Sequence, residues 1–188
     1  PVQVDETLIP SRVRKAGAKR SRSQGQSHGK SKRILVPVVG AIEVREAQEE
    51  VEPGQEPRTY AGRLRLFHVP YAAHDLLRDF VLNNVERGSV VTTDGNTAYD
   101  SLARRGYHHR AKVLHGDPEL AEEWLPMIHL IFSNLKAWLI GTHHSVSPQH
   151  MQAYLNEYVF RFNRRFYPLW SFNSVLGIAA HKEGPTYE

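Results

Sequence analysis

Residues 2–7 read Val-Gln-Val-Asp-Glu-Thr, an alternation of apolar and polar side chains that is typical of a β-strand. This strand carries Asp5, and a second apolar run over residues 89–93 ends at Asp94. A lone aspartate after a strand is more often a turn former, above all in the pair Asp94-Gly95. Two strand-borne carboxylates are nevertheless what a metal-dependent phosphoryl-transfer site needs, because Mg²⁺ binds carboxylate oxygens together with substrate phosphate.

The composition limits the class of protein. A chain of 188 residues suits one domain with a buried core, and the lack of cysteine excludes disulfides, thiolate zinc sites and a cysteine nucleophile. No run approaches the roughly 20 apolar residues of a membrane span, so we expect a soluble, cytoplasmic protein without membrane contact. The chain starts at Pro1 and enters a strand at once, which favours a fragment of a longer polypeptide.

The net charge of +4 is unevenly distributed. Residues 12–33 hold nine basic side chains and no acidic one, while the rest of the chain has 15 basic and 20 acidic residues. Glycine and serine separate the basic residues, so a flexible insertion is predicted over residues 11–33. A polyanion such as a nucleic acid is the expected partner, because the stretch follows Asp5 directly, and a solubilising loop is the alternative. The basic residues are Arg12, Arg14, Lys15, Lys19, Arg20, Arg22, Lys30, Lys32 and Arg33.

The first part of the chain predicts strands, and helices enter later. The predicted order is strand, strand, strand, helix, strand, helix, strand, over residues 2–8, 33–44, 62–69, 72–85, 89–93, 97–105 and 107–114. Three successive strands without an intervening helix favour an antiparallel meander. Pro37 in the second strand argues for a sheet edge or a bulge there.

Helical periodicity dominates the remaining sequence. A helix is predicted over residues 118–140, with Pro126 as a kink or an internal boundary. A last helix is expected over residues 147–166, capped by Ser147 with a proline at its first position. The order of elements resembles that of a ribonuclease H-like domain. We therefore expect a single α/β domain over residues 1–188, with a five-stranded mixed sheet of three antiparallel and two parallel strands flanked by helices.

In that topology the first strand is central and the fourth pairs parallel beside it. Asp5 and Asp94 would then emerge at the same edge of the sheet and share divalent ions. In two-metal phosphoryl transfer the ions lie about 3.5–4 Å apart, one activating the attacking oxygen and the other stabilising the leaving oxygen.

Six ordered motifs carry a resemblance to a known family. They are Val4-Asp5-Glu6-Thr7, Val38-Val39-Gly40-Ala41, Thr93-Asp94-Gly95 with Tyr99, Gly106-Tyr107-His108-His109, Gly141-Thr142-His143-His144 with Val146-Ser147, and residues 160–165. Through these motifs the chain resembles the catalytic domain of the DDE transposases of bacterial insertion sequences, in the ISXO2-like branch. The resemblance implies hydrolysis of DNA at a transposon end, followed by attack of the freed 3′-hydroxyl on target DNA. It assigns Asp5 and Asp94 as the first two metal ligands.

The resemblance also implies cofactors and partners. It implies a two-metal site for Mg²⁺ or Mn²⁺, double-stranded DNA as the partner (transposon ends and target), a homodimer when active, and a bacterial, nucleoid-associated location. Two alternatives stay open: a ribonuclease H-like endonuclease without joining activity, and a decayed, non-catalytic DNA-binding remnant of a transposase.

The third ligand departs from the family pattern, which places a Glu or Asn on the late helix and a Lys some turns later. Counting back from Gly141 puts Lys136 on that lysine and His129 on the acid. Seven residues correspond to roughly −20° of rotation, so both lie on one helical face, where His129 would bind metal and Lys136 would grip a phosphate. Asn134 is the alternative ligand, on another face. A structural histidine and a solvated lysine are the competing interpretations.

A histidine at this position changes the expected chemistry. Imidazole is a poor ligand for Mg²⁺ and an acceptable one for Mn²⁺, and it removes one negative charge from the site. We therefore expect weaker metal binding, a preference for Mn²⁺, and an enzyme that the substitution can impair.

Further basic and polar residues are weaker candidates. Arg161, Arg164 and Arg165 on the last helix are predicted to contact the DNA backbone, which positions a duplex without reading its sequence. A solvated helix face is the alternative. His109 is expected to face the site, because it lies inside one of the motifs.

Overall fold

The computed structural model describes residues 1–13, 32–47, 57–70, 74–114, 117–144 and 146–180. Its strands are β1 (Val2–Val13), β2 (Lys32–Glu46), β3 (Thr59–His68), β4 (Val90–Asp94) and β5 (His108–Lys112). Its α-helices are α1 (His74–Asn84), α2 (Pro118–Trp124), α3 (Pro126–His143), α4 (Met151–Asn163) and α5 (Pro168–Ala180). Short 3₁₀ turns form at Thr97–Tyr99, Ala103–Arg105 and Pro148–His150.

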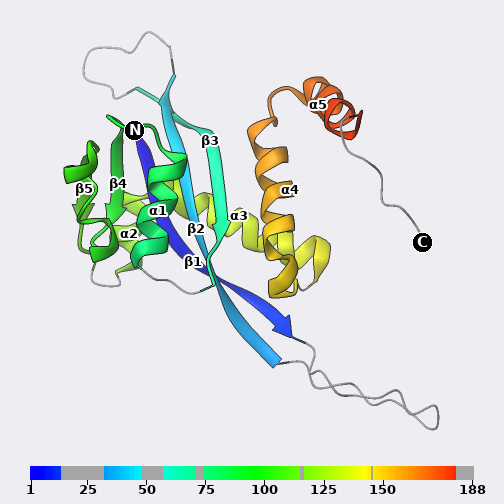
Figure 1. Ribbon diagram of the computed structural model, residues 1–188, viewed down its shortest axis with the longest axis horizontal. Coiled ribbons are helices and arrows are strands. Elements are labelled where there is room, and N and C mark those ends of the chain that lie inside the picture. The colour runs from blue at the N-terminus through cyan, green and yellow to red at the C-terminus, as the bar shows by residue number, and fades with distance from the viewer. Residues whose placement is uncertain (14–31, 48–56, 71–73, 115–116, 145, 181–188) are drawn as a thin grey trace.

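The strands form one mixed sheet in the order β3-β2-β1-β4-β5 (Figure 1). β2 pairs antiparallel with both β1 and β3, while β4 pairs parallel with both β1 and β5. The chain reaches β4 through α1, because a parallel strand needs a crossover connection. This topology confirms the predicted α/β ribonuclease H-like fold.

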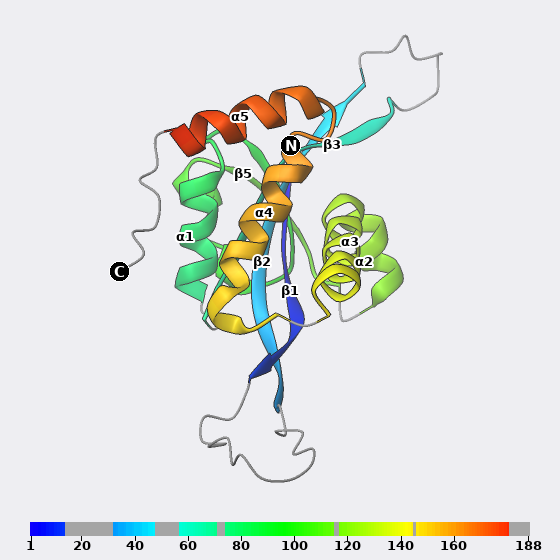
Figure 2. The same cartoon turned by 90° about the vertical axis from the view of Figure 1, so that its right-hand side faces the viewer.

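Helices pack on both faces of the sheet and create two cores (Figures 1 and 2). α3 and α4 cover one face, where Ile128 and Leu155 meet strand residues such as Ile9. α1 covers the other face, where Leu77 packs near Val4. Val4 and Ile9 are five residues apart on β1, so strand alternation sends them to opposite faces.

β2 is an internal strand although it contains Pro37. Its pairing with β3 begins only at Val38, so the position lacking an N–H lies where β3 has already ended. The Val69 N–H, beyond β3, donates to the Pro37 carbonyl at 3.2 Å. Pro37 is tolerated because that side of β2 is a local edge, and the irregularity in register falls between Ile42 and Val44.

The helical part differs from the prediction in three places. Residues 97–105 form two 3₁₀ turns instead of one helix. The boundary predicted at Pro126 is confirmed, because α2 ends at Trp124 and α3 starts at this proline. The helix predicted over residues 147–166 is shorter: Pro148–His150 form a 3₁₀ turn, the Ser147 side chain makes no capping hydrogen bond, and α4 runs from Met151 to Asn163. α5 follows it unpredicted. Residues 166–180 contain no charged side chain, so the polar face that reveals an amphipathic helix is missing.

β1 and β2 continue past the sheet as a two-stranded arm (Figure 1). Arg12 pairs with Arg33 and Val13 with Lys32, so both ends of the predicted insertion are strand. The hydroxyl of the buried Ser11 donates to the Val146 carbonyl, which ties the arm to the segment before α4. The remaining predicted DNA contacts of this insertion lie outside the described residues: Arg14, Lys15, Lys19, Arg20, Arg22 and Lys30.

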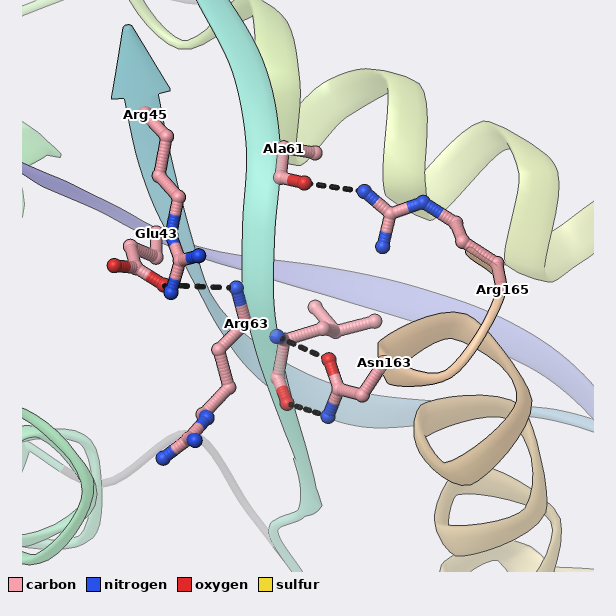
Figure 3. Close-up of polar contacts among 7 residues, drawn as sticks. Glu43, Arg45, Ala61, Arg63, Asn163 and Arg165 are labelled. Carbon is pink, nitrogen blue, oxygen red and sulfur yellow. Dashed lines mark hydrogen bonds and ion pairs between the residues drawn. The ribbon is translucent and has the colours of Figure 1, made fainter. Parts of the chain in front are cut away.

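α4 covers the outer edge of β3 with side-chain amides (Figure 3). Asn163 accepts a hydrogen bond from the Leu64 N–H at 2.7 Å and donates to the Leu64 carbonyl at 3.0 Å. Gln152 accepts from the His68 N–H at 2.8 Å and donates to the Leu66 carbonyl at 3.3 Å. These amides satisfy backbone groups that an uncovered edge strand would offer to another chain.

Candidate active site between β1 and the end of β4

Three carboxylates meet where β4 ends beside β1. Asp5, Glu6 and Asp94 each offer an oxygen, and these oxygens lie within 4.8 Å of one another. β1 pairs with β4 only as far as Gln3, so beyond that point the β4 side of β1 is open. The structure thus brings the two predicted aspartates together, with Asp94 at the end of β4 and Asp5 within β1, which continues to Val13.

Glu6 is the member of this cluster that the sequence did not single out. Neighbours on a strand point to opposite faces, so Asp5 and Glu6 are not expected to converge. The Tyr99 hydroxyl donates to Glu6 Oε1 at 2.9 Å, and Asn96 Nδ2 donates to the same atom at 3.3 Å. The available signal was a second acid beside Asp5 combined with polar residues just after Asp94.

The turn after Asp94 shows that a turn residue can also be a site residue. The Asp94 carboxylate accepts the Asn96 N–H at 3.1 Å, and the Asn96 side chain accepts the Ala98 N–H at 3.0 Å to cap the 3₁₀ turn. A Cβ atom on Gly95 would lie 2.8 Å from Cα of Val113, so glycine is needed for this close approach. The turn fixes one side of the Asp94 carboxylate and leaves it in the cluster.

His129 reaches the cluster from α3. Its Nε2 atom lies 3.0 Å from Oδ2 of Asp5. The hydrogen bond to Asp5 raises the pKa of His129, although burial opposes this shift. The raised pKa favours the imidazolium, which places a positive charge against the carboxylates.

The carboxylates themselves are short of compensating charge. Burial, with repulsion from Asp5 and Asp94, raises the pKa of Glu6 to about 7 against the opposing hydrogen bond from Tyr99. Burial is also the largest cause of the raised pKa of Asp94; repulsion from Asp5 adds to it, while the Asn96 N–H and His129 lower it. A cation at this position would relieve both effects.

Lys136 lies beside the same cluster. It lines an open cleft together with Glu6, Asn96, Thr7, Leu8 and Pro37. Lys136 follows His129 by two helical turns, the spacing from which a shared face is predicted. Asn134, the alternative ligand, is exposed on α3. The cleft is therefore lined by one member of the carboxylate cluster, Glu6, and by the ammonium group of Lys136.

The arginines at the end of α4 already have partners within the protein. Arg161 forms an ion pair with Glu157 at 2.7 Å, and the Arg164 guanidinium lies 4.0 Å from the centroid of a phenylalanine ring. Arg165 donates to the Ala61 carbonyl (Figure 3). These contacts give all three side chains a structural role beside the predicted one in DNA binding.

Arg165 lies away from the carboxylate cluster. Ala61, the partner of Arg165, pairs with Val44 of β2, whereas Asp5 pairs with Gly40. Four strand residues correspond to about 13 Å. Any DNA contact made by Arg165 would therefore be remote from the reacting groups.

His109 is connected to the backbone of Asp94 through the Thr93 hydroxyl. Thr93 Oγ1 lies 2.9 Å from His109 Nε2 and donates to the Asp94 carbonyl at 2.7 Å, so His109 is the donor of the first bond. Trp124 Nε1 donates to the Thr93 carbonyl at 2.9 Å. His109 thus contacts Thr93, the residue before Asp94, and burial lowers its pKa.

The chain matches a known protein family. The sequence profile of the ISXO2-like transposase domain matches residues 1–163, which include every residue of the cluster and end before α5. No curated protein and no solved structure matches the chain. None of the helices in the described part of the chain is long and apolar enough to cross a membrane.

Proposed function

We propose that this chain, which belongs to the ISXO2-like transposase family, cleaves DNA strands at transposon ends and transfers them into target DNA in a metal-dependent reaction. The observation that carries the proposal is the cluster of Asp5, Glu6 and Asp94 beside an open cleft. Such a cluster is what phosphoryl transfer requires, because the protein contributes mainly positioned charge.

The donor set fits Mg²⁺ or Mn²⁺ at a two-metal site. All three clustered groups are carboxylates, the hard oxygen ligands that these ions prefer. Burial, with repulsion between the carboxylates, raises the pKa values of Glu6 and Asp94, and a bound cation would favour the charged forms that burial disfavours. Asp5 and Asp94 would hold the ions, and Glu6 is available as a further ligand. When bound, the ions would activate the attacking oxygen and stabilise the leaving oxygen.

His129 is proposed as the ligand that completes the site. Its Nε2 atom, which contacts Asp5, is the atom that would bind a metal after losing its proton. Imidazole suits Mn²⁺ better than Mg²⁺, so Mn²⁺ should support the faster reaction. Equal or faster strand transfer with Mg²⁺ would count against His129 as a ligand and leave it as the hydrogen-bond partner of Asp5.

Double-stranded DNA is the proposed partner, held by backbone phosphates. Lys136 lies in the cleft, where its ammonium group would bind a phosphate next to the reacting groups. Arg12, Lys32 and Arg33 are exposed on the arm and would supply further contacts to backbone phosphates. Binding should weaken steeply with salt, because each neutralised phosphate releases counterions. A homodimer acting on paired ends in the bacterial nucleoid is part of the same proposal.

The proposal is tested with Asp5→Asn and Asp94→Asn on two substrates: uncut transposon ends, which report cleavage, and pre-cut ends with a supercoiled target plasmid, which report strand transfer. We expect each variant to lose cleavage and strand transfer by about 10²-fold or more while it still binds DNA. Asp79→Asn on α1 is the control, because Asp79 is exposed and pairs only locally with Arg78. Unchanged cleavage in both site variants would refute the assignment and favour the non-catalytic remnant.

The endonuclease alternative uses the same carboxylates and is separated by the products. A transposase joins the 3′-hydroxyl of the pre-cut end to the plasmid, whereas an endonuclease only nicks or linearises it. Nicking without joined product, lost in Asp5→Asn, would favour the endonuclease.

A further inference from the structure

Gln3 connects the strand that carries Asp5 to the helix that carries His129. Its Oε1 atom accepts the Met127 N–H at 3.0 Å and the Ile128 N–H at 3.1 Å. Both N–H groups belong to the first turn of α3, where a helix has no internal acceptor for them. One glutamine side chain thus caps a helix from a different part of the chain.

α3 needs this external cap because it lacks one of its own. The residue before it, Leu125, has no side-chain acceptor, and the first turn contains no acidic residue. α2 shows the ordinary arrangement, in which Asp117 accepts the N–H groups of Glu119 and Leu120. In α3 the acceptor that is normally adjacent in sequence comes instead from β1.

The position of Gln3 links this cap to the site. Gln3 and Asp5 are two residues apart on β1, so their side chains project from the same face of the sheet. On α3, His129 directly follows Ile128, and its Nε2 contacts Asp5 at 3.0 Å. The contacts of Gln3 and of Asp5 thus connect β1 to the start of α3 at two neighbouring points. A shift of α3 by one residue would move it about 1.5 Å and rotate it about 100°, which would break both contacts.

We propose that Gln3 is a positioning residue of the site, which sets α3 on β1 so that His129 reaches Asp5 and Lys136 reaches the cleft. This inference rests on the proposed function of the carboxylate cluster. It adds the group that determines where the helical residues stand relative to the strand carboxylates.

Packing alone does not determine that placement. α3 is seated on the sheet by buried apolar side chains, including Ile128, Phe132 and Leu135. The apolar stripe selects the face of α3 that meets the sheet, but apolar contacts are non-directional and define the position of its first turn less sharply than hydrogen bonds do. The hydrogen bonds of Gln3 are directional and act one and two residues before His129. Their removal should leave the fold intact and the site misplaced.

The test compares Gln3→Leu, which removes the acceptor at similar size, with Gln3→Glu, which retains an acceptor oxygen and suits a helix N-terminus. Amide hydrogen exchange reports on the N–H groups of Met127 and Ile128. We expect Gln3→Leu to exchange about tenfold faster at these two amides, and Gln3→Glu to keep their protection. Gln149→Leu, a glutamine replacement outside α3, is the control and should leave both amides unchanged.

The positioning role is separated from simple stability by two further measurements on the same proteins. Mn²⁺ binding, followed by electron paramagnetic resonance, should weaken in Gln3→Leu, and the cleavage rate constant should fall while KM for DNA stays constant. Lost amide protection with unchanged Mn²⁺ binding and cleavage would overturn the positioning role. Unprotected amides in Gln3→Glu, or protected ones in Gln3→Leu, would overturn the cap itself.

The exchange experiment is also independent of the proposed reaction. If Asp5→Asn leaves cleavage intact, the proposed function fails, yet the amide protection that Gln3 provides can still be measured without metal or DNA. If the protection is absent while Asp5→Asn abolishes cleavage, the inference about Gln3 fails and the proposed function stands.

Discussion

His129 on α3 and Asp5 on β1 close the site across the helix–sheet contact, with Nε2 of the imidazole 3.0 Å from Oδ2 of the carboxylate. The contact raises the pKa of His129, so the imidazolium persists at a higher pH than for a free histidine. The imidazolium occupies one side of Asp5, which is also a proposed metal ligand. Proton and metal therefore compete for the same pair of groups.

This competition predicts that Mn²⁺ binding releases protons and strengthens as pH rises. His129 must lose its proton before Nε2 can bind metal, and Glu6, with its pKa raised to about 7, must lose one as well. Isothermal titration calorimetry in buffers of different ionisation enthalpy measures the number of protons released. His129→Gln should reduce that number and leave the proton from Glu6. An identical number in the variant would contradict the competition at His129.

The raised pKa of Glu6 predicts that the free energy of unfolding falls as pH rises. Its folded-state pKa of about 7 exceeds the ordinary 4.5, so between these values the folded protein keeps a proton that the unfolded chain has lost. The free energy of unfolding should therefore decrease as pH rises from about 4.5 to 7, by about 3 kcal/mol as an upper bound. The loss of the His129 ion pair as pH rises through its raised pKa acts in the same direction. Urea unfolding at pH 5 and pH 8 measures the total.

Glu6→Gln separates the two contributions to this pH dependence. The amide oxygen can still accept from Tyr99 and Asn96, and no charge has to be buried, so the variant should be more stable than the wild type at pH 8 and similar at pH 5. Glu86→Gln, at an exposed position, is the matched control and should change neither value. A variant that is less stable than the wild type at pH 8 would show that the carboxylate of Glu6 is favourable in the fold.

The convergence of Asp5 with Asp94 was accessible from the sequence, but that of Glu6 was not. The strand patterns around both aspartates are local, and the order of elements places the two strands side by side. Glu6 joins them only because β1 leaves β4 after Gln3, and because Tyr99 and Asn96 hold its carboxylate. Strand alternation predicts the opposite face for this residue.

The contacts of α3 show a second limit of prediction from the sequence. Helical spacing was enough to place His129 and Lys136 on one face. It could not reveal that the helix is capped by Gln3, 124 positions before Met127, because no local pattern encodes an acceptor supplied by another element. Local periodicity predicts elements and their faces, while contacts between distant side chains depend on how the elements pack.

Gly40 is predicted to be required for the seating of α3. It pairs with Asp5, and a Cβ atom there would lie 2.9 Å from Phe132 Cε1 and 3.0 Å from Ile128 Cδ1. Gly40→Ala should lower the free energy of unfolding by about 1–3 kcal/mol, because the buried side chains of α3 must move away. Because the displaced α3 carries His129, the site should also bind Mn²⁺ more weakly. Urea unfolding and metal titration measure these two effects.

Gly141→Ala provides the matched control for this substitution. Gly141 lies near the end of α3, and a Cβ atom there would meet nothing within 4 Å. Alanine is the better helix former, so this variant should be as stable as the wild type or more stable by up to about 1 kcal/mol. A loss of stability of similar size in both variants would mean that the tight contact at Gly40 is not the cause.

Asn163 is predicted to hold α4 on the edge of β3 through both atoms of its amide (Figure 3). Asn163→Asp keeps the acceptor for the Leu64 N–H but turns a carboxylate oxygen toward the Leu64 carbonyl, which should cost about 1–3 kcal/mol of stability in urea unfolding. Asn156→Asp is the matched control, because Asn156 is exposed and uses only its oxygen, which accepts from Gln152 at 2.8 Å. The control should stay within about 0.5 kcal/mol of the wild type. If Asn163→Asp were equally mild, α4 would be held on β3 by its apolar face and not by the amide pair.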